Sequence, residues 1–203
     1  MKNMIKTKQD LLYYLECDKV ALKIPKKRRF PRPILDLVWN YEIIMRKAEY
    51  YGNVPGPFHR LLYLYYYFRF KRIGIKLSIS IGLNTFGPGL RIPHYGTIVV
   101  NGAAEIGENC CILECVNIGA TNGSDRAPQI GNNVFIGSGA KIIGDIIVAD
   151  GCTIGTGAVV VKSILKPNST VVGVPATVIN YKGSDENIVK ATEIVRNHPY
   201  GEM

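Results

Sequence analysis

One histidine of this chain lies where the backbone is tightly specified. His94 stands within residues 84–97, a stretch that contains three glycines and two prolines. Glycine and proline are common where a chain must turn sharply. An imidazole titrates near neutral pH, so it can act as a general base toward a hydroxyl group. Two interpretations stay open: a buried, hydrogen-bonded imidazole, or an imidazole presented at an edge by a bend between Pro93 and Gly96.

A six-residue hydrophobic repeat must position this histidine. An aliphatic residue returns at every sixth position across residues 130–160, and a row of smaller residues follows four positions behind it. The first row is Ile130, Ile136, Ile142, Val148, Ile154 and Val160, and the second is Val134, Ala140, Ile146, Cys152, Ala158 and Ile164. A period of six fits neither a helix nor an ordinary strand, and it is typical of a parallel β-helix. The sequence therefore predicts a mainly β fold of about five coils, with three hexapeptides in each coil.

The repeat extends backwards to Val100 and fails at two places. The position six residues before Val100 is His94, in a row that otherwise faces the core. Between Ile118 and Ile130 the expected aliphatic residue is Ser124, inside the polar stretch 120–128. This stretch predicts a loop extruded from a coil, and long loops on rigid scaffolds are often functional.

Metal and thiol chemistry are not expected. Some β-helix enzymes of the carbonic anhydrase type bind zinc through three histidines, whereas His94 is the only histidine within this repeat. The cysteines number five and lack metal-ligand spacing. Cys110 and Cys152 occupy the row of small core residues, which favours buried reduced thiols over the alternatives of disulfides or a nucleophile.

Helical spacing flanks the repeat on both sides. Helices are predicted over residues 8–22, 34–51, 59–72 and 185–196. The aromatic residues of the third helix favour a packing face rather than a platform for stacking bases. We therefore expect a helical N-terminal cap (1–74), a β-helix domain (75–180), and a C-terminal helix and tail (181–203).

Positive charge gathers in the N-terminal third. Residues 1–75 hold 16 Lys and Arg against 6 Asp and Glu, a net charge of +10. The densest run, 26–29, is flanked by prolines and predicts an exposed loop, with attraction to an anionic membrane surface as a second interpretation. Nucleic-acid binding is not expected, because no recognition module accompanies the charge. Residues 1–10 lack an apolar signal region, and we expect a cytoplasmic protein.

Six motifs, at 92–100, 106–109, 116–119, 125–128, 136–144 and 173–176, together resemble the hexapeptide-repeat acyltransferases of the serine acetyltransferase type. The resemblance covers about residues 75–180. It implies a left-handed β-helix, a homotrimer with sites shared between subunits, and direct transfer of an acetyl group from acetyl-CoA to a hydroxyl group.

The resemblance also implies residue roles. His94 would be the general base, without a covalent acyl-enzyme. The aspartate that usually precedes this histidine is replaced by Pro93, so Asp125 or Glu114 would orient the imidazole, unless either is only a solvated acid. Acetyl-CoA would lie along the coil edge, near Ser138, Gly139, Ala140 and Thr156. Lys141 and Lys162 could neutralise its phosphates or could simply be exposed residues.

Two further departures concern the acceptor. The serine enzymes have a histidine where this chain has Ala127, and their tail ends in isoleucine where this chain ends in Met203. These departures favour a sugar or glycan hydroxyl, as in enzymes of the same type that acetylate capsule, lipopolysaccharide and exopolysaccharide. L-serine, another hydroxyl or amine, and a non-catalytic β-helix scaffold are the alternatives.

Overall fold

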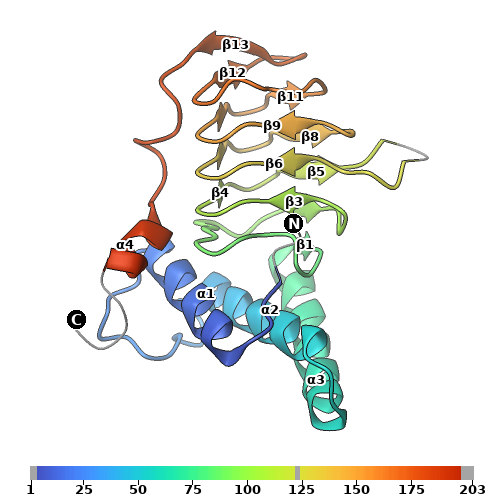
Figure 1. Cartoon of the computed structure of the whole chain (residues 1–203), viewed down its shortest axis with the longest axis vertical. Helices are drawn as coiled ribbons and strands as arrows, with labels where there is room; N and C mark the ends of the chain where they lie inside the picture. Colours follow the sequence, from blue (N-terminus) through green and yellow to red (C-terminus); the bar gives the residue numbers. More distant parts are fainter. Residues whose placement is uncertain (1–3, 122–123, 198–203) are drawn as a thin grey trace.

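A parallel β-helix stands on a layer of helices (Figure 1). The computed structural model describes residues 4–121 and 124–197. The helices are α1 (Lys8–Ala21), α2 (Leu37–Asn53), α3 (Pro57–Leu77) and α4 (Ala191–Asn197). Helix α4 returns from the far end of the β-helix and packs on α1 through Cys17, Ala21, Ala191 and Val195. Within the described residues, no helix is long and apolar enough to cross a membrane.

The strands form three sheets, one for each side of the triangular coil. The first holds β1 (Ile79–Ile81), β2 (Ile98–Val100), β5 (Asn117–Gly119), β8 (Lys141–Ile143) and β11 (Val159–Val160). The second holds β4 (Cys111–Ile112), β7 (Phe135–Ile136), β10 (Thr153–Ile154), β12 (Thr170–Val172) and β13 (Thr177–Asn180). The third holds β3 (Glu105–Ile106), β6 (Gln129–Ile130) and β9 (Ile147–Val148). Neighbouring strands run parallel, except that β13 is antiparallel to β12.

The strand register follows the six-residue period. Thr153 pairs with Phe135, 18 residues earlier, which confirms three hexapeptides per coil. One coil is longer, since Ile118 pairs with Ile142, 24 residues later. The extra hexapeptide is the loop that the missing aliphatic residue predicted; its residues 122–123 lie outside the described part of the chain.

Both hydrophobic rows point inward, and every residue of the two rows is buried. The cysteines are free; Cys110 and Cys152 are buried in the core, as predicted, whereas Cys115 is exposed at a corner. Close stacking of aliphatic side chains from coil to coil stabilises the rod, because burial of each such side chain contributes about 1.5–3 kcal/mol.

The helix bounds differ from their predictions at several ends. Helix α2 begins at Leu37, because the carboxylate of Asp36 accepts bonds from the backbone and side chain of Arg32 and holds the preceding residues outside the helix. Helix α3 is longer than predicted and has Pro57 in its first turn, where a missing N–H costs nothing. The predicted helix 185–196 shortens to α4.

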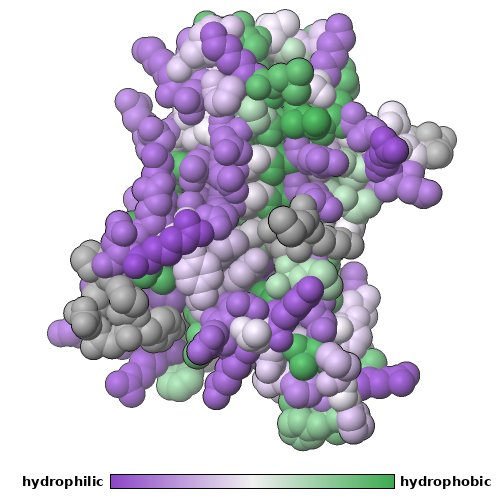
Figure 2. All heavy atoms as spheres, viewed as in Figure 1, coloured by the Kyte–Doolittle hydropathy of each residue, from purple (hydrophilic) through white to green (hydrophobic). Residues whose placement is uncertain are grey.

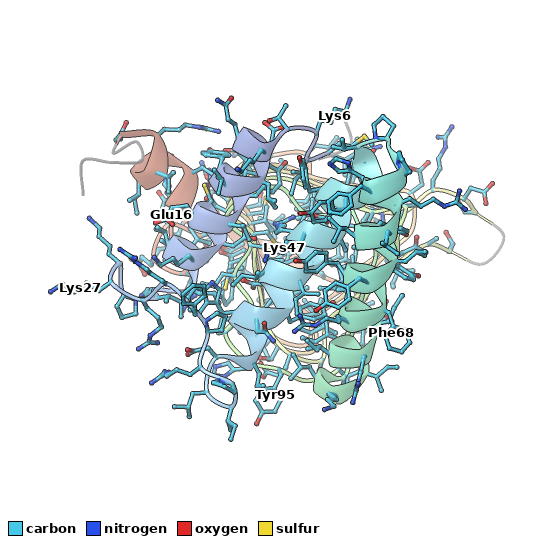
Figure 3. The ribbon with its side chains drawn as sticks, turned by 90° about the horizontal axis from the view of Figure 1, so that it is seen from below. Lys6, Glu16, Lys27, Lys47, Phe68 and Tyr95 are labelled. Atoms are coloured by element: carbon cyan, nitrogen blue, oxygen red, sulfur yellow. The ribbon has the colours of Figure 1, made fainter. Side chains whose placement is uncertain are left out.

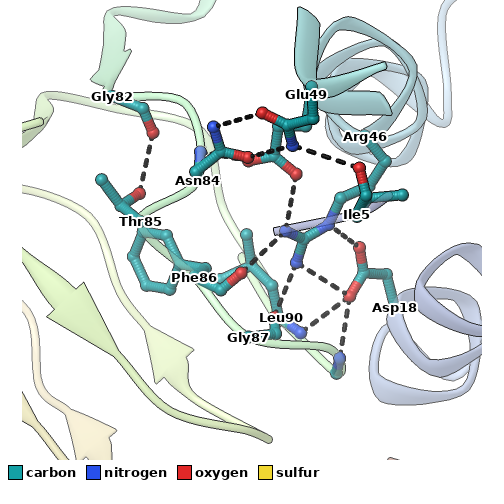
Figure 4. Close-up of polar contacts among 12 residues, drawn as sticks. Ile5, Asp18, Arg46, Glu49, Gly82, Asn84, Thr85, Phe86, Gly87 and Leu90 are labelled. Carbon is teal, nitrogen blue, oxygen red and sulfur yellow. Dashed lines mark hydrogen bonds and ion pairs between the residues drawn. The ribbon is translucent and has the colours of Figure 1, made fainter. Parts of the chain in front are cut away.

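A buried ion cluster joins the helix layer to the first coil (Figure 4). The guanidinium of Arg46 pairs with Asp18 at 2.8 Å and with Glu49 at 3.1 Å. It also donates to the carbonyl oxygens of Phe86 and Gly87, at 2.9 and 2.7 Å. All five donors of an arginine lie in one plane, so this side chain can link two helices and a loop at once.

The two carboxylates complete the attachment of the first coil. Asp18 accepts from the N–H groups of Gly89 and Leu90, both at 2.9 Å. Glu49 accepts from the N–H of Asn84 at 2.7 Å. The cap therefore fixes the backbone of residues 84–90, which leads directly to His94.

Candidate active site

His94 lies on an enlarged corner of the first coil. Arg91 aligns with Cys111 and Val99 with Asn117 on the next coil. Arg91 and Val99 are 8 residues apart in the sequence, whereas their partners Cys111 and Asn117 are only 6 apart. The corner between Arg91 and Val99 therefore holds two extra residues. The enlargement takes His94 out of the inward row, and its side chain is exposed. The buried imidazole was therefore the wrong alternative, and presentation at the coil edge is confirmed.

Glu114 is the carboxylate that meets this corner. A Cβ atom built on Gly96 would lie 2.8 Å from the Cβ of Glu114, so only glycine allows the two coils to approach this closely. One carboxylate oxygen of Glu114, Oε1, accepts from the hydroxyl of Ser138 at 2.6 Å. The other, Oε2, is shielded from solvent and has no hydrogen-bond partner within the described residues. It is available to accept an N–H from a neighbouring imidazole.

The pKa of Glu114 is lowered from its ordinary value. The largest cause is the hydrogen bond from Ser138, and the charge of His94 contributes in the same direction. The close approach of Gly96 to Glu114 places the two groups at one corner of adjacent coils. Glu114 therefore stays ionised at neutral pH, as a carboxylate that orients an imidazole must be.

The same corner is repeated in the next two coils, where glycines form a ladder of backbone hydrogen bonds. The N–H of Gly139 donates to the carbonyl of Glu114 at 2.9 Å, and the N–H of Gly157 donates to the carbonyl of Ser138 at 2.8 Å. Gly139 and Gly157 have positive φ angles of 73° and 69°, which favour glycine. A Cβ atom built on Gly157 would touch nothing within 4 Å, so the ladder faces open space. Ser138, Gly139 and Thr156 thus share the corner that begins at His94, whereas Ala140 faces the core.

The remaining candidate residues lie at the two ends of the strands of the first sheet. Lys141 begins β8 beside this corner and donates to the carbonyl of Cys115 at 2.7 Å. Lys162 follows β11 at the opposite end of the sheet and is exposed. Asp125 is exposed in the extruded loop that leaves that same end. His94 precedes β2 and Asp125 follows β5 of the same parallel sheet, so one chain places these two at opposite ends of that sheet. Within the described residues, no hydrogen bond or ion pair joins His94 to Asp125 or to Glu114.

Sequence reasoning missed two groups that shape the site. The hydroxyl of Ser138 holds Glu114, whereas the sequence placed Ser138 only near acetyl-CoA. The charged residues of α2 are not indicated by the apolar spacing of that helix. Glu42, Arg46 and Glu49 follow one another at helical spacing and are all buried, and this spacing was a readable signal. Within the described residues, no His, Cys, Asp and Glu side chains gather as a group of metal ligands.

This arrangement can perform proton transfer at an exposed corner. An imidazole next to an ionised carboxylate can take a proton from a hydroxyl group and hold the resulting charge. The adjacent ladder of glycine corners offers backbone groups to an extended ligand. The site therefore suits attack of an acceptor hydroxyl on a bound, activated acyl group.

Comparisons with known proteins agree with this description. Residues 127–162 match the family model described as bacterial transferase hexapeptide, six repeats. The serine acetyltransferase of Escherichia coli K12 is 43% identical over 67 residues, which are 32% of this chain and 24% of that protein. The probable serine acetyltransferase 1 of rice (Oryza sativa subsp. japonica) is 40% identical over 62 residues, 30% of this chain and 20% of that protein. The chain thus spans about a quarter or less of the length of these relatives.

Solved structures match over a longer part of the chain. The serine acetyltransferase of Brucella abortus S19 in complex with coenzyme A has a TM-score of 0.62 at 27% identity, covering 87% of this chain and 68% of that one. Soybean serine acetyltransferase complexed with serine has a TM-score of 0.66 at 26% identity, covering 84% and 70%. The fold is therefore a left-handed parallel β-helix with helical ends, as predicted, and it is similar to the fold of these serine acetyltransferases.

Proposed function

We propose that this chain is an acetyl-CoA-dependent O-acetyltransferase with His94 as its general base. The observation that carries the proposal is the enlarged corner, where the imidazole is exposed and the backbone at Gly96 packs closely against Glu114 on the next coil. A solenoid without catalytic function has no need for a histidine, a held carboxylate and an open glycine ladder at one corner.

Each residue of the site has its own role in the proposed reaction. Glu114 accepts an N–H of His94 through its free oxygen and leaves the other ring nitrogen to face the acceptor hydroxyl. His94 removes the hydroxyl proton as the oxygen attacks the thioester carbonyl, and it returns that proton to the departing thiolate of CoA. Backbone N–H groups at the coil corner stabilise the oxyanion of the tetrahedral intermediate. The acetyl group passes directly to the acceptor.

The glycine ladder is our proposed site for the pantetheine arm of acetyl-CoA. Support comes from the open space at Gly157 and from the solved Brucella abortus relative, whose structure contains coenzyme A. Ser138, Gly139 and Thr156 supply the corner, and Ala140 supplies only backbone, since its side chain is buried. Lys141, beside this corner, supplies positive charge for the phosphates, whereas Lys162 lies at the opposite end of the sheet.

The comparisons favour L-serine as the acceptor. The relatives and solved structures named above are serine acetyltransferases, and the soybean enzyme was solved with serine. A sugar acceptor, the main expectation from the sequence, has no support among them. It remains the second candidate because Pro93 and Ala127 replace two groups of the serine pattern, and Ala127 is buried here.

We further propose a homotrimer in which each site lies between two subunits. Such packing explains how Asp125, which one chain does not bring to its own His94, could approach the His94 of a neighbouring chain. The relationship to hexapeptide-repeat transferases supports this assembly.

A thiol-release assay with acetyl-CoA tests the proposal. The acceptor panel contains L-serine, free hexoses, N-acetylated amino sugars and nucleotide sugars, and product mass identifies the acetylated compound. We expect saturable CoA binding by calorimetry and turnover with at least one acceptor. Turnover with L-serine alone excludes the sugar acceptor. Absence of CoA binding would refute the proposal and favour the scaffold.

A further inference from the structure

We propose that the helical cap docks on an anionic membrane surface, with a basic pocket between its helices taking the phosphate of a lipid headgroup. This inference concerns a surface that the proposed acetyl transfer does not use. The pocket has a volume of about 600 Å³ and lies between α1, α2, α3 and residues 26–31. Figure 3 shows this helix layer from below, with Glu16 and Lys47 among its labelled side chains.

The pocket is lined by cations far more than by anions. Its basic residues are Lys19, Lys26, Arg28, Arg29, Lys47 and Arg69, and its only acidic lining residue among those described is Glu16. Arg28 is also paired with Asp36 at 3.5 Å. The excess positive charge that the sequence concentrates in residues 1–75 is thus focused on one concave site, which favours an anionic ligand.

Several of these cations are held in place by the protein. Lys19 donates to the carbonyl of Lys26 at 3.0 Å, which ties the basic loop to α1. Lys47 lies over the ring of Tyr66 at 5.3 Å. Arg69 donates to the hydroxyl of Tyr65 at 3.0 Å. A site whose charges are already positioned loses little entropy when it binds a phosphate.

Large apolar side chains project beside the same pocket. Phe30 lines the pocket and is nevertheless 80% exposed. Ile34 and Leu35, a few residues later, are 81% and 70% exposed. On α3, Leu61 and Tyr65 share a helical face with Arg69 and are also exposed. Exposed aromatic and aliphatic residues around a basic site are typical of proteins that insert into the headgroup boundary of a bilayer.

Because basic residues and projecting apolar side chains lie together, this surface favours a membrane lipid over a soluble phosphate compound as the ligand. A free phosphate ester needs only the cations, and gives Phe30 and Leu35 no partner. An anionic bilayer satisfies both sets at once, and each Lys or Arg near it increases partitioning roughly fivefold. Trp39 and Ile43 add apolar side chains to the lining of the pocket.

Co-sedimentation of the full chain with vesicles tests the proposal. One set is pure phosphatidylcholine, and the other contains about a third phosphatidylglycerol. We expect binding to the anionic vesicles only, weakened by added salt because charge pairing is screened. The double variant Lys47→Glu/Arg69→Glu should reduce the partition constant about tenfold or more, and Phe30→Ser should reduce it severalfold.

Matched control variants distinguish binding at the pocket from a general electrostatic attraction of the whole chain to the vesicles. Lys8→Glu/Lys182→Glu makes the same change in net charge away from the pocket, and Leu165→Ser removes an apolar residue that is 71% exposed on the β-helix. Equal losses in the pocket and control variants would contradict the pocket. So would binding of glycerol 3-phosphate to the pocket without binding of the vesicles. Thiol release in solution should be unchanged in the pocket variants, so a failure here is distinguishable from a failure of the proposed acetyl transfer.

Discussion

At the scale of single residues, the surroundings of His94 are set by the coil above it. Gly96 allows the corner to approach Glu114, and Ser138 holds that carboxylate from one coil further along. A histidine on an exposed corner would otherwise rotate freely. We infer that Glu114 is a positioning residue, which limits the imidazole to one orientation.

Glu114→Gln tests this role. Loss of a hydrogen bond to a charged partner costs about 1.5–3 kcal/mol, which corresponds to a fall in kcat of about 10- to 150-fold. Glu114→Asp should recover part of kcat, and the pH profile of kcat should shift in the Gln variant, neither of which a purely structural role explains. The comparison is Asp125→Asn, for which we expect less than a threefold loss. An equal loss would assign the orienting role to Asp125 of a neighbouring subunit.

The sequence indicated His94 because a break in a regular row is visible without a structure. It did not indicate the hydroxyl of Ser138. The contact between Ser138 and Glu114 joins residues that are 24 apart, in the one coil that contains the extruded loop. The point at which the inserted loop leaves the β-helix decides which side chains meet across that coil. The six-residue repeat does not predict that point.

At the scale of elements, α2 connects the cap to the coil that carries the site. Arg46 lies at the centre, fully buried, with two carboxylates and two backbone carbonyls around its guanidinium. Arg46→Met should lower the free energy of unfolding by about 3–5 kcal/mol, because two buried carboxylates lose their partner. Chemical denaturation measures this, with the exposed Arg60→Met as control. A change below about 1 kcal/mol in the Arg46 variant would show that the cluster does not hold the cap.

Glu42, on the same helix, gives stability a pH dependence. Its carboxyl group is buried, and burial raises its pKa well above the ordinary value. Because the folded state disfavours the charged form, stability falls as pH rises from the unfolded pKa of about 4.3 toward the raised folded pKa. The slope is about 1.4 kcal/mol for each pH unit in this window.

Glu42→Gln should remove this slope. The variant should match the parent chain below about pH 4, where both side chains are neutral, and should be more stable at pH 8. Urea unfolding at the two pH values measures the difference. Greater stability of the parent chain at pH 8 would mean that its charged carboxylate has a stabilising partner.

The helices and strands differ in whether the interactions that determine them are local in the sequence. Strands, coil length and the extruded loop follow from the six-residue rows, because each row is a repeated burial requirement. The start of α2 depends on the contact between Arg32 and Asp36, and the shortened α4 depends on packing against α1. The first contact joins residues only four apart, and the apolar spacing of the helix does not reveal it. The second joins distant parts of the chain, whose proximity the sequence does not state.

At the scale of the whole molecule, the rod has flat sides that are not fully polar. Figure 2 shows hydrophobic residues gathered over the upper coils, near β8, β9 and β11. Ile147 and Val161, from that part of the chain, are about half exposed. Flat sides with exposed aliphatic residues favour packing against another copy.

Light scattering over a range of dilutions tests the proposed trimer. We expect a mass of three chains, and we expect thiol release per chain to fall at dilutions where that mass falls, because each site needs two subunits. A chain that is fully active at the mass of a single copy would contradict a shared site.

The central claim is that His94 is the base for acetyl transfer, and His94→Ala tests it most directly. General base catalysis contributes about 10²- to 10⁴-fold, so kcat for thiol release should fall by this factor while CoA binding stays within about threefold. His59→Ala, which removes a histidine packed against Tyr50 and Tyr51 in the cap, should retain kcat. A His94→Ala enzyme within tenfold of the parent kcat would contradict the account.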